Sequence, residues 1–156
     1  MKTTAEIMVK FPKTCSSHES LRTAARLMSN FNIGSLPVIN ESKKVIGIIT
    51  DRDICLALVA HSYDVAVQEV MTKKVFTCLA GDPIQSVLRT MRTKQVSRLP
   101  VVDHEQHIKG IITLKNIARH TYESKDDATW ESSKNESVLK TIHSLALRPE
   151  QEAAVV

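Results

Sequence analysis

The spacing of hydrophobic positions predicts short strands that alternate with helices. Residues 13–16 form an extended piece. A stripe with helical spacing follows, with Ser17 as its N-cap and its end near Asn30; its members are Leu21, Ala24, Ala25, Leu27 and Met28. Residues 35–39 and 45–49 are β-branched runs on either side of a polar turn. The second run is apolar throughout, which predicts a strand covered on both faces. A helix that opens at residues 50–53 and reaches residue 60 completes a β-α-β-β-α unit.

This unit occurs twice in the chain. At an offset of 63 residues and without a gap, positions 6–54 match positions 69–117 at 15 of 49 places, whereas unrelated positions agree at about one in seventeen. In the second copy, the first helix is expected to have Asp82 as its N-cap and Pro83 as its first residue. Strands at 99–102 and 108–113 and a helix from Lys115 follow. Each half is too small to close a core comfortably, so the duplication predicts an α/β fold of two repeats packed with pseudo-two-fold symmetry.

The end of the chain follows a different pattern. Residues 123–137 are polar apart from Trp130, which predicts a linker. A helix is expected at residues 138–148, capped by Asn135 or Ser137 and stopped before Pro149. A helix of this length is marginal alone in water, so we expect it to dock on its own module or on a partner subunit. The expected boundaries of the two repeats are 5–62 and 68–122.

Composition and motifs exclude several classes of protein. The hydrophobic content of 42% and the charged content of 24% are those of a globular protein. No apolar run approaches the ~18 residues of a membrane span, and neither a secretory signal nor a disulfide framework is evident, so a cytoplasmic protein with no membrane contact is expected. A net charge of +4 with six aromatic residues argues against nucleic-acid binding. The phosphate loop, nucleophile elbow and zinc-protease motifs are absent, which argues against an enzyme.

Two short motifs, each present in both copies, carry a family resemblance. One is Leu-Pro-Val, at residues 36–38 and 99–101. The other is Gly-Ile-Ile-Thr-x-x-Asp/Asn, at residues 47–53 and 110–116. With the doubled unit in register, residues 5–122 resemble a tandem pair of CBS domains, named after cystathionine β-synthase. The resemblance implies a regulatory module that binds AMP, ADP, ATP or S-adenosylmethionine in a cleft between the repeats, requires no cofactor and pairs into homodimers.

We call the Gly-Ile-Ile-Thr-x-x-Asp/Asn motif the box. Asp53, the acidic residue of the first box, suits such a ligand on chemical grounds. A carboxylate can accept hydrogen bonds from both ribose hydroxyls, and a helix N-terminus suits a phosphate group. Asp53 follows Thr50 by three residues, in the first turn of a helix that begins at a strand end. The same Thr-x-x-Asp spacing is also that of a capping box. Both interpretations stay open, and the two roles can coexist.

The two copies differ where the ligand would bind. Asn116 replaces the acid, and an amide accepts through one oxygen only, without charge. The resemblance places basic residues of the phosphate site at Arg98 and Lys115, although both also fit a solvated surface. If the clefts are shared across the pseudo-dyad, one well-equipped site is predicted from Thr50, Asp53, Arg98, Lys115, Thr14, Cys15, Pro37 and Pro100. A weak or empty second site is predicted from Thr113, Asn116, Thr77, Cys78 and Ser35, with Arg52 more readily solvated than bound.

The cysteines and histidines predict little further chemistry. Cys15 and Cys78 lie on the segments that lead each repeat, where the family resemblance implies backbone against the purine, and each also fits a small residue on an edge strand. Cys55 is expected in the core. His104 and His107 lie in a polar hairpin, and no Cys-x-x-Cys motif supports a metal site, so none is expected.

Two functions remain from the sequence. The first is a non-catalytic sensor that binds an adenosine compound and passes its occupancy to an effector protein of unknown identity. The second is a ligand-free dimerising scaffold whose working surface is the C-terminal helix with Trp130. Asp53, Arg98 and Lys115 favour the first, whereas the altered second box favours the second.

Overall fold

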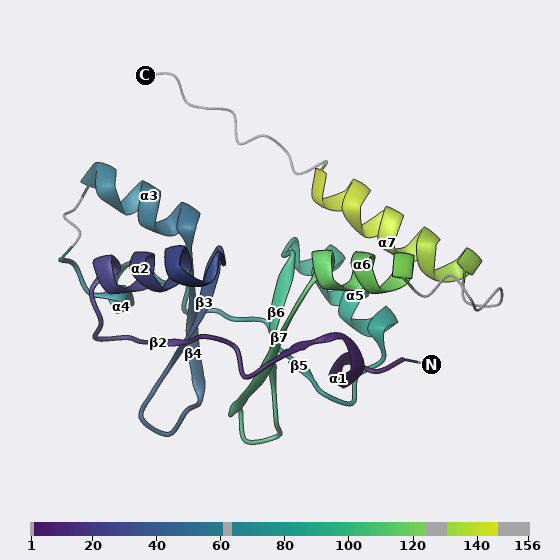
Figure 1. The fold of residues 1–156 in the computed structure, drawn as a ribbon, viewed down its shortest axis with the longest axis horizontal. Helices are drawn as coiled ribbons and strands as arrows, with labels where there is room; N and C mark the ends of the chain where they lie inside the picture. The colour runs from purple at the N-terminus through teal and green to yellow at the C-terminus, as the bar shows by residue number, and fades with distance from the viewer. Residues whose placement is uncertain (1, 61–63, 124–130, 147–156) are drawn as a thin grey trace. The chain divides into compact units, whose positions relative to one another are not determined.

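A computed structural model describes residues 2–60, 64–123 and 131–146 of the chain (Figure 1). These residues form two compact units, which do not coincide with the two sequence repeats. The first unit comprises Met1–Met8, Gly81–Leu99 and Ile112–Val156, and the second comprises Val9–Ala80 and Pro100–Ile111. Trp130 lies outside the described residues. No described helix combines the length and apolar character needed to cross a bilayer.

The second unit contains all of repeat 1 that follows residue 8. Its elements are β1 (Val9–Lys10), β2 (Cys15–Ser16), α2 (Leu21–Phe31), β3 (Ser35–Ile39), β4 (Val45–Thr50), α3 (Asp51–Ala60), α4 (Val67–Val70) and β5 (Cys78–Leu79). Strand β3 lies in the centre of a three-stranded sheet, parallel to β2 and antiparallel to β4. The β-α-β-β-α order predicted for residues 13–60 is therefore confirmed.

The core of the second unit lies between this sheet and its helices. Leu21, Ala24 and Met28 of α2 are buried, as the helical stripe predicts, and so are Leu36 and Val38 of β3. Strand β4 is different from the prediction, because only Gly47 and Ile49 are buried while the other residues are half-buried. This alternation indicates one fully covered face, with the second face only partly covered.

The first unit is helical apart from the strand ends that enter it. It contains α1 (Thr4–Ile7), α5 (Ile84–Lys94), α6 (Leu114–Glu123) and α7 (Glu131–Ala146). The strands β6 (Arg98–Val102) and β7 (Ile108–Thr113) each have residues in both units, and with β1 and β5 they form a sheet of order β1-β7-β6-β5. Helix α7 packs along α5 and α6 (Figure 1). Val138 and Thr141 of α7 are buried, so docking on the chain's own module is confirmed.

Several predicted helix ends were wrong by a few residues. Helix α2 has Ser20, not Ser17, as its N-cap, because the Ser20 hydroxyl accepts from the Thr23 N–H at 3.3 Å. Pro83 is the N-cap of α5 and not its first residue. Helix α7 begins at Glu131, so Asn135 and Ser137 lie within it and half of the expected linker is helical. The polar composition of residues 131–137 hid this helix, since its early turns carry few apolar side chains.

Equivalent positions in the two repeats share unusual backbone angles. Asn32 and Gln95 end α2 and α5 in the left-handed region, with φ of 50° and 55°. Lys43 and Gln106, in the two hairpin turns, have φ of 58° and 71°. Both pairs are separated by 63 residues, which is the offset of the sequence repeat. The duplication therefore extends to the turns, although the side chains there differ.

Candidate functional site

The first Thr-x-x-Asp box lies where β4 ends and α3 begins. The N–H and hydroxyl of Thr50 both donate to Oδ2 of Asp53, at 2.8 and 2.7 Å. The Asp53 N–H donates in return to the Thr50 hydroxyl at 3.2 Å. This is a closed capping box, so the capping role is present. It occupies one carboxylate oxygen, and no described residue forms a hydrogen bond with Oδ1.

The second box has the same geometry with an amide in place of the acid. The N–H and hydroxyl of Thr113 donate to Oδ1 of Asn116, at 3.2 and 2.6 Å, and the Asn116 N–H donates to the Thr113 hydroxyl at 3.1 Å. Because the cap needs an acceptor, the amide oxygen must face Thr113. The atom left over is Nδ2, a donor, whereas the atom left over in Asp53 is an acceptor. The two boxes therefore offer opposite hydrogen-bonding chemistry.

Most of the predicted site residues of repeat 1 lie close together on the sheet of the second unit. Ser35 is the register partner of Thr50 across β3 and β4, and Cys15 is the partner of Val38 across β2 and β3. Pro37 is buried in the central strand and Thr14 directly precedes β2. The structure thus places Ser35, which was predicted for the weaker site, beside Thr50.

The corresponding residues of repeat 2 are divided between the units. Thr77, Cys78 and Pro100 belong to the second unit, and Cys78 is the register partner of Val101. Arg98, Thr113, Lys115 and Asn116 belong to the first unit. Arg98 is half-buried at the start of β6, and Lys115 is exposed in the first turn of α6. The joint site of Thr50, Asp53, Arg98 and Lys115 stays a prediction.

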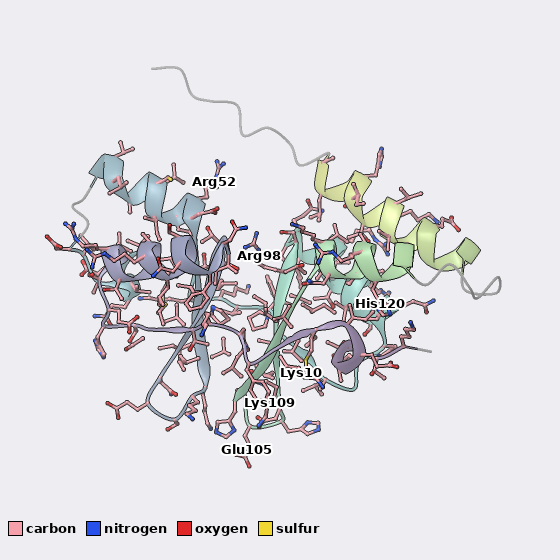
Figure 2. The ribbon with its side chains drawn as sticks, viewed as in Figure 1. Lys10, Arg52, Arg98, Glu105, Lys109 and His120 are labelled. Carbon is pink, nitrogen blue, oxygen red and sulfur yellow. The ribbon has the colours of Figure 1, made fainter. Side chains whose placement is uncertain are left out.

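Arg52 and Arg98, which are labelled in Figure 2, are basic residues considered for the predicted sites. Arg52 is exposed in the first turn of α3, and its N–H donates to Oδ1 of Asp51 at 2.8 Å. No described acidic side chain forms an ion pair with the guanidinium groups of Arg52 or Arg98. Both cations are therefore available to a ligand or to solvent.

The three cysteines lie in different surroundings. Cys15 is 3% exposed, and this burial, assisted by the nearby Glu19 carboxylate, raises the pKa of its thiol to about 12. A thiol with this pKa stays protonated at neutral pH, so Cys15 is not an activated nucleophile. Cys78 is also buried, whereas Cys55 is exposed on α3, so the expectation that Cys55 lies in the core was wrong. Helix α3 turns this residue outward because Ile54 and Ala57 take the inner face.

A charged cluster at the tip of the β6–β7 hairpin is absent from the sequence predictions. Oδ2 of Asp103 lies 3.2 Å from Nδ1 of His107 and 3.1 Å from Nζ of Lys109, and Oδ1 accepts from the backbone N–H groups of Glu105 and His107. Partial burial opposes ionisation of Asp103, but these donors prevail and hold the pKa of its carboxyl well below the usual value. Figure 2 shows Glu105 and Lys109 at this tip. The spacing of Asp103 and His107, four residues apart around a turn, was the available signal.

This tip also joins the two repeats within the second unit. The Val45 N–H donates to the carbonyl of Gln106 at 3.1 Å, and the Ile108 N–H donates to the carbonyl of Lys43 at 3.2 Å. The cluster around Asp103 therefore lies beside the backbone contact between the two hairpins. The side chains of Asp103 and His107 are only partly exposed to solvent. Among the described residues, no three His, Cys, Asp or Glu side chains are placed to hold a metal ion.

Comparison with known proteins identifies the family. The CBS domain profile matches residues 5–60 and again residues 67–123, so the chain belongs to the CBS domain family and carries two such domains. A solved CBS domain pair, that of protein MJ0100 in complex with 5'-methylthioadenosine and S-adenosyl-L-methionine, is 34% identical with a TM-score of 0.71. The similarity covers 76% of this chain and 98% of that one.

Two curated relatives show how such pairs occur. Hypoxic response protein 1 of Mycobacterium tuberculosis is 34% identical over 122 residues, which are 76% of this chain and 85% of that protein. A crystal structure of that name, with two coordinated zinc ions, has a TM-score of 0.70 at 30% identity, covering 76% of this chain and 98% of that one. The L-aspartate semialdehyde sulfurtransferase of Methanocaldococcus jannaschii is 35% identical over 114 residues, which are 73% of this chain but 22% of the enzyme. In that enzyme the matching region is a minor part of a longer chain.

Proposed function

We propose that this protein is a non-catalytic regulatory module that binds an adenosine-containing ligand through the Thr50–Asp53 box. The observation that carries the proposal is that the two oxygens of the Asp53 carboxylate have different surroundings. Oδ2 closes the cap of α3, and Oδ1 has no hydrogen bond from a described residue. A second carboxyl oxygen at the start of a helix can accept from a ribose hydroxyl without loss of the cap.

The ligand class is supported by the related pair of protein MJ0100, which holds two adenosyl compounds. We extend that class to this chain as AMP, ADP, ATP or S-adenosylmethionine. The predicted roles of Arg98 and Lys115 concern the phosphate groups, so they distinguish nucleotides from adenosine and from S-adenosylmethionine. The response would reach an effector protein through a difference in ligand affinity between two states of the module, because equal affinities shift no equilibrium.

The first experiment is thermal unfolding with adenosine, AMP, ADP, ATP and S-adenosylmethionine. A ligand at a hundred times its dissociation constant adds about 2.7 kcal/mol, which raises the midpoint of a chain of this size by roughly 5–10 °C. A positive result requires at least one compound to produce such a shift. Unchanged midpoints with every compound at millimolar concentration would contradict the proposal and leave the scaffold function.

The second experiment uses the repeat itself as a guide to a substitution. Asp53→Asn keeps a cap oxygen, as Asn116 shows, and exchanges the remaining acceptor for a donor. We expect the free energy of unfolding to change by less than ~0.5 kcal/mol, while loss of a charged hydrogen bond weakens ligand binding by about 10- to 150-fold. Asp51→Ala is the matched control, because it removes a neighbouring acid and leaves the box intact. Equal binding by the Asp53→Asn and wild-type proteins would assign Asp53 to capping alone.

Arg98→Ala and Lys115→Ala test the phosphate roles by isothermal titration. Each substitution is expected to weaken AMP or ATP binding more than adenosine binding. Equal losses for adenosine and its phosphates would remove both residues from the proposal, while the Asp53 result would stand.

The scaffold function is the second candidate. It is favoured by one observation, namely that large apolar side chains are exposed on helices of the described chain.

A further inference from the structure

The segment that links β1 to β2 exposes an aromatic side chain between two lysines. Phe11 is 91% exposed, which is the largest exposed fraction among the large apolar side chains of the described residues. Lys10 and Lys13, on either side of it, are exposed as well. Residues 7–18 contain no aspartate and no glutamate. This surface is therefore apolar and positively charged at the same place.

Lys13 connects this segment to helix α2. Its Nζ lies 4.1 Å from the centre of the Phe31 ring, a cation–π contact, and Phe31 is itself 47% exposed. We call Lys10, Phe11, Lys13 and Phe31 the Phe11 patch, and all four belong to the second unit. No described acidic side chain forms an ion pair with either lysine of the patch.

The backbone of Phe11 is strained. Its φ of 50° lies in the left-handed region, which a bulky residue rarely adopts. The other described residues with positive φ occur in pairs at equivalent positions of the two repeats, whereas Lys74, the counterpart of Phe11, does not share this conformation. The duplicated fold therefore does not require it. A strained residue whose side chain is almost fully exposed points to a role outside the fold.

The free edge of β1 offers little to an added strand. The Phe11 N–H donates to the carbonyl of Lys109 on β7 at 3.4 Å, and Lys10 precedes it beside Lys109 and Gly110 (Figure 2). Backbone groups alternate in direction along a strand, so those of Lys10 face away from β7. Pro12 has no N–H to continue this edge. A partner must therefore be recognised mainly through the side chains of the Phe11 patch.

We propose that the Phe11 patch binds an acidic segment of a partner protein that offers a hydrophobic pocket to the Phe11 ring. Charge complementarity selects this occupant, because lysines without acidic neighbours attract carboxylates. An exposed aromatic ring that enters a pocket is a typical anchor of a protein interface. Two lysines release too few counterions for strong binding to a nucleic acid, and an interfacial membrane anchor presents the apolar face of a whole helix.

The first experiment identifies the chemistry of the partner. Random peptides displayed on phage are selected on the wild-type chain after depletion on the Phe11→Ser variant. The selected peptides are expected to be rich in aspartate and glutamate, and fluorescence anisotropy is expected to show binding to the variant that is weaker by about tenfold or more. A selection that yields no binder, peptides without acidic enrichment, or equal binding to both proteins would overturn the proposal.

Charge reversal tests the complementarity, and the second repeat supplies the matched control. The double variant Lys10→Glu, Lys13→Glu is expected to weaken binding of a selected peptide by about tenfold or more and to remove most of its salt dependence. Lys73→Glu with Lys74→Glu makes the same change of net charge in the corresponding segment of repeat 2, and nearly unchanged binding is expected. Equal losses in the two double variants would reduce the effect to net charge and overturn the proposal. Phe11-dependent binding to phosphatidylserine vesicles or to a single-stranded oligonucleotide, with no peptide bound, would overturn it in favour of another occupant.

Phe11→Gly separates a binding role of Phe11 from a structural one. Glycine adopts the left-handed region without strain, so the midpoint of thermal unfolding is expected to stay the same or to rise by up to ~4 °C, while the selected peptide is lost. A lower midpoint would show that the ring stabilises the fold and would overturn the assignment of Phe11 to binding. The Thr50–Asp53 box is unchanged in this variant, so its thermal shift with adenosine compounds is expected to equal that of the wild type. Failure of this inference would therefore leave the proposed function in place.

Discussion

The two repeats share a backbone but differ in what they offer to other molecules. Both end a strand with threonine and close the same cap, yet with respect to the described residues Asp53 has an acceptor without a hydrogen bond and Asn116 has a donor without one. Repeat 1 exposes apolar side chains on α3, whereas the helices of repeat 2 are packed against α7. Most buried positions are equivalent in the two copies, whereas the box and the exposed positions of α3 differ from their counterparts. The proposed function assigns a role to the first of these differences.

The largest expected effect tests the equivalence of the buried positions. Leu36 and Leu99 occupy the same place in β3 and β6, and both are fully buried. Leu36→Ala and Leu99→Ala are each expected to lower the free energy of unfolding by about 2.7–5 kcal/mol, because each leaves a cavity. Urea denaturation measures both values. A loss below ~1 kcal/mol in one variant only would show that the two cores are not equivalent.

The next largest effect concerns the boxes. Asn116→Asp keeps the cap oxygen and gives repeat 2 the acceptor that repeat 1 has. If repeat 2 fails to bind ligand because it lacks an acid, isothermal titration of the variant is expected to detect a second binding event. If repeat 2 already binds weakly, its affinity is expected to rise about tenfold or more, because a charged hydrogen bond is gained. Binding that remains at the wild-type stoichiometry and affinity would assign the difference between the repeats to other residues. Gln85→Glu, an exposed position on α5, serves as the control for a charge change elsewhere.

A change in stability of similar size tests the covering of repeat 2. Val138→Ala removes two methyl groups from the buried face of α7, which is expected to cost about 1.5–2.5 kcal/mol. His143→Ala, exposed on the same helix, is expected to cost less than ~0.5 kcal/mol. Hydrogen exchange measured on both variants is expected to show faster exchange in α5 and α6 after Val138→Ala and no change in α2 and α3. Faster exchange in both repeats would mean that α7 stabilises the whole chain.

The smallest effect contrasts the two hairpin turns. Asn40 in repeat 1 accepts the Lys44 N–H at 2.9 Å, and Asp103 in repeat 2 accepts the His107 N–H at the same distance. Asp103→Asn keeps such an acceptor but loses the pairing with Lys109. Since the folded-state pKa of Asp103 lies below its ordinary value, its contribution is complete above the unfolded pKa and is lost as the pH falls through the folded one. The variant is expected to be slightly less stable than wild type at pH 7 and to converge with it in acid. A stability difference that does not change with pH would exclude the charge as its cause.

The repeated pattern of residues predicted most of the fold. The 63-residue offset, the helical stripes and the β-branched runs were enough for the order of strands and helices in residues 13–60 and for their counterparts in repeat 2. They also predicted the positions of both boxes at the junctions of strand and helix. Such features depend on neighbours in sequence, and local periodicity reports on them directly.

Other features could not be predicted because residues distant in sequence decide them. The first turns of helix α7 are polar and carry no apolar stripe that could predict them. The helix packs on α5 and α6, which come from distant parts of the sequence. Cys55 was expected inside because it lies in an apolar run. In that run Ile54 and Ala57 take the buried face and leave Cys55 outside. The ionic cluster around Asp103 depends on Lys109 from the opposite strand of its hairpin.

By itself, the order of residues determined that this chain holds two copies of one small α/β unit and that only the first has an acid in its box. Tertiary structure alone decided which atom of each box remains free, which face of α3 meets water and which face of α7 is buried. The physical reason is that a repeat pattern specifies local dihedral preferences and burial periodicity. The partner of a given atom depends on which segments, far apart in the chain, fold against each other.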